Sequence, residues 1–439
     1  MNESLFIQFV KSIWPKLALY IKEKVNNGKE LTYLHKTMLT KVYSADQKWE
    51  GTSANTTYVS ADVVAMDSPL PPKRRDAIAQ SNGVLPKIGM KKILRETQIN
   101  TINIMRARLQ MADTPEAKKA EKARILTKLT DDAVACSIGI DERNEANFLT
   151  ALSEGVIVVE DEDNTGVGIR LDYGYLDENT FGVDEAGSIS KESIERVIDA
   201  ADAKGVSFSI IAIALSTYKK MRQEQWAKEL VASYKGMTYS DGTKLPVPTA
   251  ADFDEAFSDE FGGIRFLKID RSITVEKNGN RKSYKPFSAN RLVFLVNENV
   301  GSLVWGTLAE ATNPVAGVVY STVDEYKLIA KYSKTDPLQE FTSGQAIIAP
   351  VIENVEQIFI LDATVVYEAE PAAINDDETP ATDYVTVWGG SYKKSDLITA
   401  MKAMGVTIAV NATDETVVKK IGVLTEEQQA ELKAAVTAA

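Results

Sequence analysis

The residues with the clearest potential for chemistry form a short acidic segment in the middle of the chain. Acidic side chains stand at 161, 162 and 163, Gly166 ends that stretch, and Asp172 follows six residues later. This spacing is typical of calcium-binding loops. However, Thr165 stands where such loops place a further carboxylate or amide, and the flanks at 156–159 and 168–171 have the pattern of strands. We therefore interpret the segment as a solvated acidic hairpin tip and predict that it binds no calcium.

The chain has few of the Cys and His residues from which a nucleophile-based active site is usually built. The only cysteine is Cys136, in a helical stretch of small and apolar residues, and the only histidine is His35. These two residues are too few for a zinc site and too isolated in sequence to indicate a Cys–His dyad. No glycine-rich phosphate-binding motif occurs either. Composition leaves carboxylate-based catalysis as the one open enzyme class, and we expect no metal or cofactor.

The overall charge argues against a protein whose main task is to grip nucleic acid. The chain has 439 residues, with 62 acidic and 50 basic side chains and a net charge of -12. Nucleic-acid binders neutralise phosphates with an excess of Lys and Arg. An acidic chain suits a protein that stays soluble at high concentration, or one that encloses DNA without adhering to it. The length predicts two or three subdomains.

Targeting signals are not apparent in the sequence. An acidic residue, Glu3, stands where a secretory signal would carry positive charge. The most apolar run, 206–215, has about half the length that a membrane span requires. We expect a protein that stays in the cytoplasm and has no membrane partner.

The first third of the chain divides into an arm, an extended loop and a helical region. Residues 1–50 are predicted to be a helical arm with aromatic anchors. Residues 51–95 lack helical periodicity and carry prolines at 69, 71 and 72, which predicts a long extended loop or hairpin. Residues 96–155 have helical periodicity, with Thr114 as an N-cap and a further helix expected at 141–152.

The remainder of the chain is predicted to be mixed α/β, followed by a linker and a small module. Residues 156–335 alternate helix and strand patterns, and 336–366 contains late strands. The linker 367–383 has six acidic residues, two prolines and no Lys or Arg. Residues 384–439 are predicted to form a small helical module, which resembles the helix-extended-helix folds related to SAP and LEM modules.

Three short stretches carry a resemblance to a known family. The stretches at 65–73 (AMDSPLPPK) and 83–88 (GVLPKI) resemble the extended loop of tailed-bacteriophage major capsid proteins with the Hong Kong 97 fold. The stretch 340–346 (EFTSGQA), with Pro350 and Val351 after it, resembles the return from the axial to the peripheral domain of that family. The resemblance covers residues 1–366 and leaves out the C-terminal module.

The resemblance implies an α+β fold and a mechanical function. It implies a peripheral domain built on spine helices, an axial domain over 156–335, return strands over 336–366, and an arm and loop that reach onto neighbouring subunits. The implied partners are further copies of the chain in hexamers and pentamers, portal, scaffold or decoration proteins, and packaged DNA bound without sequence-specific contacts. The implied location is the virion, with assembly in the host cytoplasm.

The loop 51–95 is expected to be the main assembly element. A segment interrupted by prolines is poorly suited to burying its own apolar side chains, so a neighbour has to cover them. The basic triplet at its centre is interpreted as a contact with acidic groups of that neighbour, because it lacks the interleaved aromatic residues of a nucleic-acid patch. The predicted assembly contacts are Met66, Leu70, Lys73, Arg74, Arg75, Leu85 and Ile88.

Two alternatives from other classes remain at this point. One is a carboxylate-dependent hydrolase, for which the acidic residues would supply the acid and the base. The other is an oligomeric scaffold protein that forms no shell.

Overall fold

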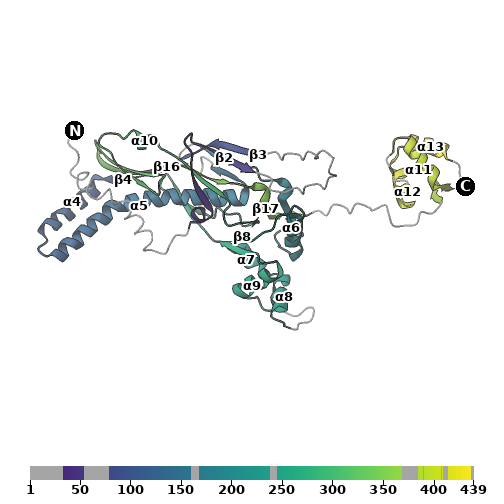
Figure 1. Ribbon diagram of the computed structural model, residues 1–439, viewed down its shortest axis with the longest axis horizontal. Coiled ribbons are helices and arrows are strands. Elements are labelled where there is room, and N and C mark those ends of the chain that lie inside the picture. The colour runs from purple at the N-terminus through teal and green to yellow at the C-terminus, as the bar shows by residue number, and fades with distance from the viewer. Residues whose placement is uncertain are drawn as a thin grey trace, which may run out of the picture. The chain divides into compact units, whose positions relative to one another are not determined.

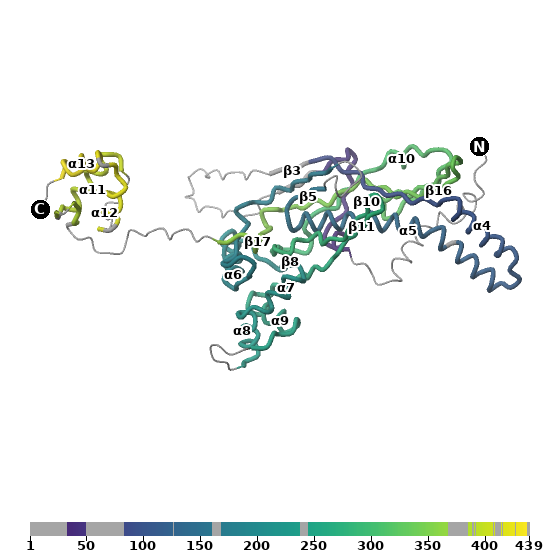
Figure 2. The backbone as a smooth tube through the Cα atoms, turned by 180° about the vertical axis from the view of Figure 1, so that it is seen from behind, coloured from purple at the N-terminus to yellow at the C-terminus, as the bar shows by residue number. Residues whose placement is uncertain are grey.

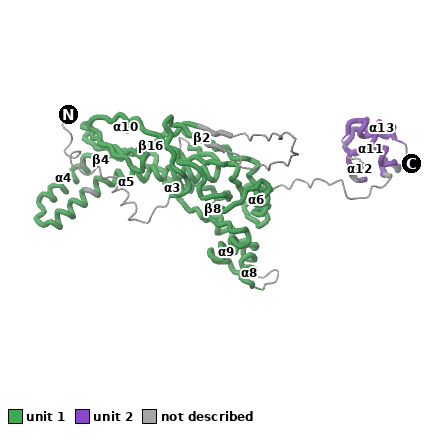
Figure 3. The backbone as a smooth tube through the Cα atoms, in the orientation of Figure 1, with its two compact units in different colours: residues 1–367 green, residues 368–439 purple. Residues whose placement is uncertain are grey.

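The structure is a computed structural model that describes residues 33–53, 79–159, 168–237, 245–367 and 384–436, apart from 389, 407 and 409–413. The chain divides into two compact units, Met1–Tyr367 and Glu368–Ala439 (Figure 3). They are called unit 1 and unit 2.

One long helix organises unit 1. Helix α5 runs without a break from Pro115 to Glu154 beside the larger sheet (Figure 1). The side chain of Thr114 accepts a hydrogen bond from the Ala117 N–H, as the N-cap prediction requires, and Gly155 ends the helix in a left-handed conformation. The separate helix expected at 141–152 is wrong, because that stretch continues α5. Helix α4 (Glu96–Met111) precedes α5 and packs against its first turns.

The larger sheet of unit 1 has six strands and lies against α5. Its strand order is β1-β13-β16-β15-β14, and β4 pairs with β16. Only the β1–β13 pair is parallel. The strands are β1 (Leu39–Tyr43), β4 (Lys87–Arg95), β13 (Gly301–Gly306), β14 (Val319–Val323), β15 (Lys327–Thr335) and β16 (Leu338–Ile352).

Close contact between helix and sheet requires a small residue on β16. A Cβ atom added at Gly344 would lie 2.8 Å from the Cβ of Cys136 on α5 and 3.1 Å from a methyl carbon of Ile329 on β15. The absence of a side chain at Gly344 therefore lets α5 approach the sheet closely.

A second, five-stranded sheet carries most of the other helices of unit 1. Its order is β7-β17-β12-β8-β9. The strands are β7 (Thr180–Val183), β8 (Ile210–Ala214), β9 (Arg265–Ile269), β12 (Arg291–Leu295) and β17 (Phe359–Val366). The helices are α6 (Lys191–Ala203), α7 (Leu215–Met221), α8 (Gln225–Tyr234) and α9 (Ala250–Glu260).

Shorter elements connect these sheets and helices in the described part of unit 1. Three two-stranded hairpins are β2–β3 (Lys48–Ser53 with Ala79–Val84), β5–β6 (Val156–Val159 with Ile169–Asp172) and β10–β11 (Ile273–Lys277 with Asn280–Tyr284). Helices α3 (Leu34–Thr37) and α10 (Ala309–Thr312) and the 3₁₀ helices η2 (Asp177–Asn179) and η3 (Val355–Gln357) lie between the longer elements.

The predicted helical arm needs correction in its last part. In residues 33–50, only α3 is helical, and β1 and the start of β2 take up the rest. Residues Leu39–Tyr43 form a strand because β1 pairs in parallel with β13, far away in sequence. The hydrophobic periodicity of a short segment carries no information about a partner strand so far away in sequence.

The smaller unit has its own hydrophobic core. Unit 2 contains the hairpin β18–β19 (Tyr384–Val387 with Gly390–Lys393) and helices α11 (Lys394–Ala403), α12 (Asp414–Val423) and α13 (Glu426–Ala435). The side chains of Leu397, Met401 and Leu432 are fully buried in it. The predicted helical character of this module is confirmed, and the sequence did not indicate the hairpin.

The predicted α+β class is confirmed, and so is the order of elements that the resemblance implies. An extended hairpin comes first, then the long helix, a mixed α/β region and a return through long strands. Helix α5 joins two apolar clusters, since Leu129 and Ala133 lie in one and Phe148 and Leu152 in the other.

Candidate assembly surface

The extended hairpin is clamped at its base. Trp49 on β2 is 2% exposed and its ring lies 5.4 Å from that of Tyr173. A Cβ added at Gly83 on β3 would lie 2.7 Å from the indole nitrogen of Trp49, so the opposite strand needs a glycine there. The Leu85 N–H donates to the Gln47 carbonyl at 2.8 Å. Both strands thus leave the body of unit 1 from a fixed point (Figure 2).

Five of the seven predicted contacts fall beyond that base. Met66, Leu70, Lys73, Arg74 and Arg75 lie outside the described residues, and their role in assembly stays a prediction.

The other two predicted contacts lie on the body of unit 1. Leu85 is 5% exposed and packs in the main core of its own subunit, so the expectation that a neighbour has to cover it is wrong. Ile88 is half-buried at the edge of the same core. The proline-rich pattern of the loop hid the fact that its final residues return to the sheet.

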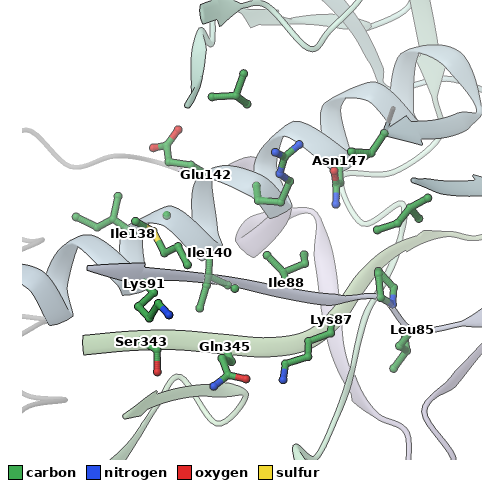
Figure 4. Close-up of a pocket in the computed structure, with 18 of the residues that line it drawn as sticks. Leu85, Lys87, Ile88, Lys91, Ile138, Ile140, Glu142, Asn147, Ser343 and Gln345 are labelled. Carbon is green, nitrogen blue, oxygen red and sulfur yellow. The ribbon is translucent and has the colours of Figure 1, made fainter. Parts of the chain in front are cut away.

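A groove of about 2250 Å³ begins next to the hairpin base. Ile138 and Glu142 line it from α5 and Ile88 lines it from β4, whereas Lys91 and Gln345 line it from the face of β4 and β16 that is turned away from α5 (Figure 4). Strand β4 pairs with β16 along its whole length, and its other edge pairs with no strand among the described residues. An open edge beside a groove can receive an extended segment.

A buried charge network fixes the point where the N-terminal arm joins α5. The side chain of His35 is fully buried, and its Nδ1 lies 2.6 Å from a carboxylate oxygen of Glu145. That carboxylate also accepts the backbone N–H groups of Leu34 and His35, each at 3.0 Å. A second carboxylate, Asp141, accepts from Lys327 at 2.7 Å and from Lys36 at 2.9 Å. Arm, helix and strand β15 are therefore held together by one set of ion pairs.

The network shifts the pKa of neighbouring groups. Burial raises the pKa of Asp324, but the ammonium groups of Lys327 and Lys36 outweigh it and lower that pKa to about 2. Burial and the carboxylates of Glu142 and Asp141 raise the pKa of Tyr33 well above its ordinary value. The Tyr33 hydroxyl donates to Glu142 at 3.0 Å, and Arg271 pairs with the same carboxylate. These acidic groups are occupied by structural partners.

The residues that the sequence singled out for possible chemistry have structural roles wherever the structure describes them. Cys136 is fully buried, and burial together with the charge of Asp132 raises the pKa of its thiol to about 11. The strands expected on either side of the acidic loop are confirmed as β5 and β6, whereas the loop itself, 160–167, lies outside the described residues. Within the described ranges, no cluster of His, Cys, Asp or Glu could hold a metal ion.

No helix among the described residues is both long and apolar enough to span a membrane. The clamped hairpin, the open edge of β4 and the groove together form the candidate assembly surface of unit 1.

Known proteins resemble the chain in structure, but not in sequence. No family profile and no curated protein sequence matches it. A protein named as a capsid protein of a prophage of Escherichia coli CFT073 is 13% identical, with a TM-score of 0.46 over 79% of this chain and 98% of that one. The capsid of cyanophage A-1(L) is 10% identical, with a TM-score of 0.40 over 75% and 91%. A virus-like particle from Pyrococcus furiosus is 12% identical, with a TM-score of 0.35 over 79% and 98%.

Proposed function

We propose that this protein is the major capsid protein of a tailed bacteriophage, which self-assembles into a closed shell around DNA. The observation that carries the proposal is the architecture of unit 1. A single 40-residue helix ties two sheets together, and a hairpin clamped at its base extends from the body. This architecture supports the extended loop, spine and axial domain that the resemblance to the Hong Kong 97 fold implies, in that order along the chain.

The surface of unit 1 supports association between copies. The hairpin base is fixed by the buried side chains of Trp49 and Leu85, and β4 is fixed by its pairing with β16, so the elements that reach outward start from a rigid frame. A contact repeated many times in a closed assembly gains avidity that a single contact lacks. We propose hexamers and pentamers of this chain as the repeating contacts, the virion as its location, and portal, scaffold or decoration proteins as further partners. We also propose the host cytoplasm as the place of assembly.

The carboxylate hydrolase has no support in the described residues. The buried carboxylates Asp141 and Glu145 are held by Lys327 and His35, and Glu142, which reaches the groove, is bound by Tyr33 and Arg271. A general acid or base needs a carboxyl group that faces the substrate and is open to it.

Charge reversal in the extended hairpin tests its proposed role in assembly. The variant Lys73→Glu, Arg74→Glu, Arg75→Glu is compared with wild type by sedimentation at low and moderate salt, with circular dichroism as the check on folding. We expect a folded variant that assembles poorly, and more so at low salt, where like charges are less screened. Normal particles at low salt would show that the basic triplet plays no part in assembly.

A further inference from the structure

Two charged surfaces of opposite sign lie at opposite ends of unit 1. The first is the helical hairpin, residues 96–128, formed by α4 and the first turns of α5. It has seven Lys and Arg against four Asp and Glu, a net charge of +3, in a chain whose net charge is -12. Its exposed basic side chains are Arg108, Lys118, Lys119, Lys122, Arg124 and Lys128.

The helical hairpin has little core of its own near its tip. Ile102 and Ile125 are fully buried where the two helices meet the body, but towards the tip Ile104 is 55% and Met111 is 79% exposed. A pair of helices with so few buried contacts gains little stability from its own packing. The tip therefore combines exposed apolar side chains with positive charge, as a docking element does.

The second surface lies on α6. Its acidic stripe consists of Glu192, Glu195, Asp199 and Asp202, at spacings of three, four and three residues, so the four side chains follow one face of the helix. Residues 177–204 include eight Asp and Glu and three Lys and Arg, which gives a net charge of -5. Lys191 pairs with Glu195, whereas Glu192, Asp199 and Asp202 form no ion pair with any described residue.

Apolar groups flank the acidic stripe as they flank the basic tip. Val365, Val366 and Tyr367 at the end of β17 are each more than 40% exposed. The guanidinium of Arg196, on α6 next to the stripe, lies 3.7 Å from the centre of the Tyr367 ring. Both surfaces thus offer apolar area together with charge, and the charges are opposite.

The two surfaces cannot meet within one subunit. Figures 1 and 2 place α4 and α6 at opposite ends of unit 1, which is one compact unit. We infer that the helical hairpin of one copy docks on the acidic stripe and β17 end of a second copy. Such a contact is heterologous, joining different faces of identical chains, and it repeats from copy to copy. This contact adds detail to the proposed shell function. It rests on that function only for the statement that the assembly closes into a shell.

Nucleic acid is a less suitable occupant of the helical hairpin. Asp113, Glu116 and Glu121 lie among its basic residues, and Glu121 pairs with Arg124 at 2.8 Å. A phosphate backbone would be repelled by those carboxylates and would leave Ile104 and Met111 exposed. A protein surface with acidic and apolar groups satisfies both features.

Charge reversal on each surface, followed by mixing, tests the contact. The hairpin variant is Lys118→Glu, Lys119→Glu, Lys122→Glu, and the stripe variant is Glu192→Lys, Asp199→Lys, Asp202→Lys. The hairpin changes place acids in the first turns of α5, where the helix dipole favours them, so folding should be kept. The matched control, Lys402→Glu, Lys419→Glu, Lys420→Glu, makes the same charge change at exposed positions of unit 2.

Each variant alone should need at least about tenfold more protein to assemble than wild type, which corresponds to about 1.4 kcal/mol per contact. The control should assemble as wild type does. An equimolar mixture of the hairpin and stripe variants should recover assembly, because each hairpin then meets a stripe of opposite charge. Recovery on mixing excludes misfolding as the cause of the loss.

Three results would overturn the contact: assembly of the hairpin variant at the wild-type concentration, equal loss in the control, or no recovery on mixing of two folded variants. Normal particles of the hairpin variant that retain less nucleic acid would assign the hairpin to nucleic acid instead. If wild type forms only small oligomers, the shell proposal fails. The contact still stands in that case if oligomer mass follows the same loss and recovery.

Discussion

Removal of the buried Lys327 ammonium should destabilise unit 1 more than any exposed charge change. Its side chain is 1% exposed and donates to Asp141 at 2.7 Å and to Asp324 at 2.8 Å. Lys327→Met keeps most of the side-chain volume and leaves two carboxylates short of a partner. Breaking a buried ion pair from one side costs about 3–5 kcal/mol. Lys36 remains 2.9 Å from Asp141, so we expect the lower end, about 3 kcal/mol.

Urea unfolding of dilute, unassembled full-length protein, followed by circular dichroism, measures this loss. The matched control is Lys334→Met on the same strand, where the side chain is exposed and the change should stay within about 0.5 kcal/mol. A loss below about 1 kcal/mol for Lys327→Met, or one equal to that of the control, would refute the reasoning that the network holds arm, helix and strand together.

Four further predictions follow from single features of the structure. Because the pKa of Asp324 is lowered from 3.8 to about 2 in the folded protein, its contribution of about 2 kcal/mol is present above pH 4 and lost as the pH falls towards 2; Asp324→Asn should flatten that decline in acid unfolding curves. Gly344→Ala should cost about 1–3 kcal/mol in thermal unfolding, since the added methyl meets Cys136, whereas Gly422→Ala meets open space and should cost nothing. The Cys136 thiol should react with a disulfide reagent only as the protein unfolds, and rapid labelling of native protein would contradict its burial. Deletion of 384–439 should leave assembly intact, because unit 2 has its own core; soluble protein without particles would disprove this.

Local pattern was sufficient for elements whose stability is local. The Ser190 cap of α6, the Asn278–Gly279 turn of β10–β11 and the Thr425 capping box of α13 all form as their sequences indicate. These features depend on residues within a few positions of one another.

The features that the sequence did not predict depend mainly on contacts between residues far apart in the chain. The strand β1 exists because β13 pairs with it, and Leu85 is buried because the chain returns to the core after the hairpin. His35 stands in a polar stretch, yet its partner Glu145 is 110 residues away. The continuity of α5 through Gly139 was also hidden, because glycine inside a helical pattern lowers the expectation of a helix.

The central claim is that copies of this chain build a closed shell. Electron cryo-microscopy of the particles that sediment from cells expressing the full-length protein tests it most directly. We predict closed shells of uniform size, with unit 1 forming the wall and the helical hairpin of one subunit in contact with α6 of the next. Discrete small oligomers, or open filaments without closed particles, would contradict the proposed function.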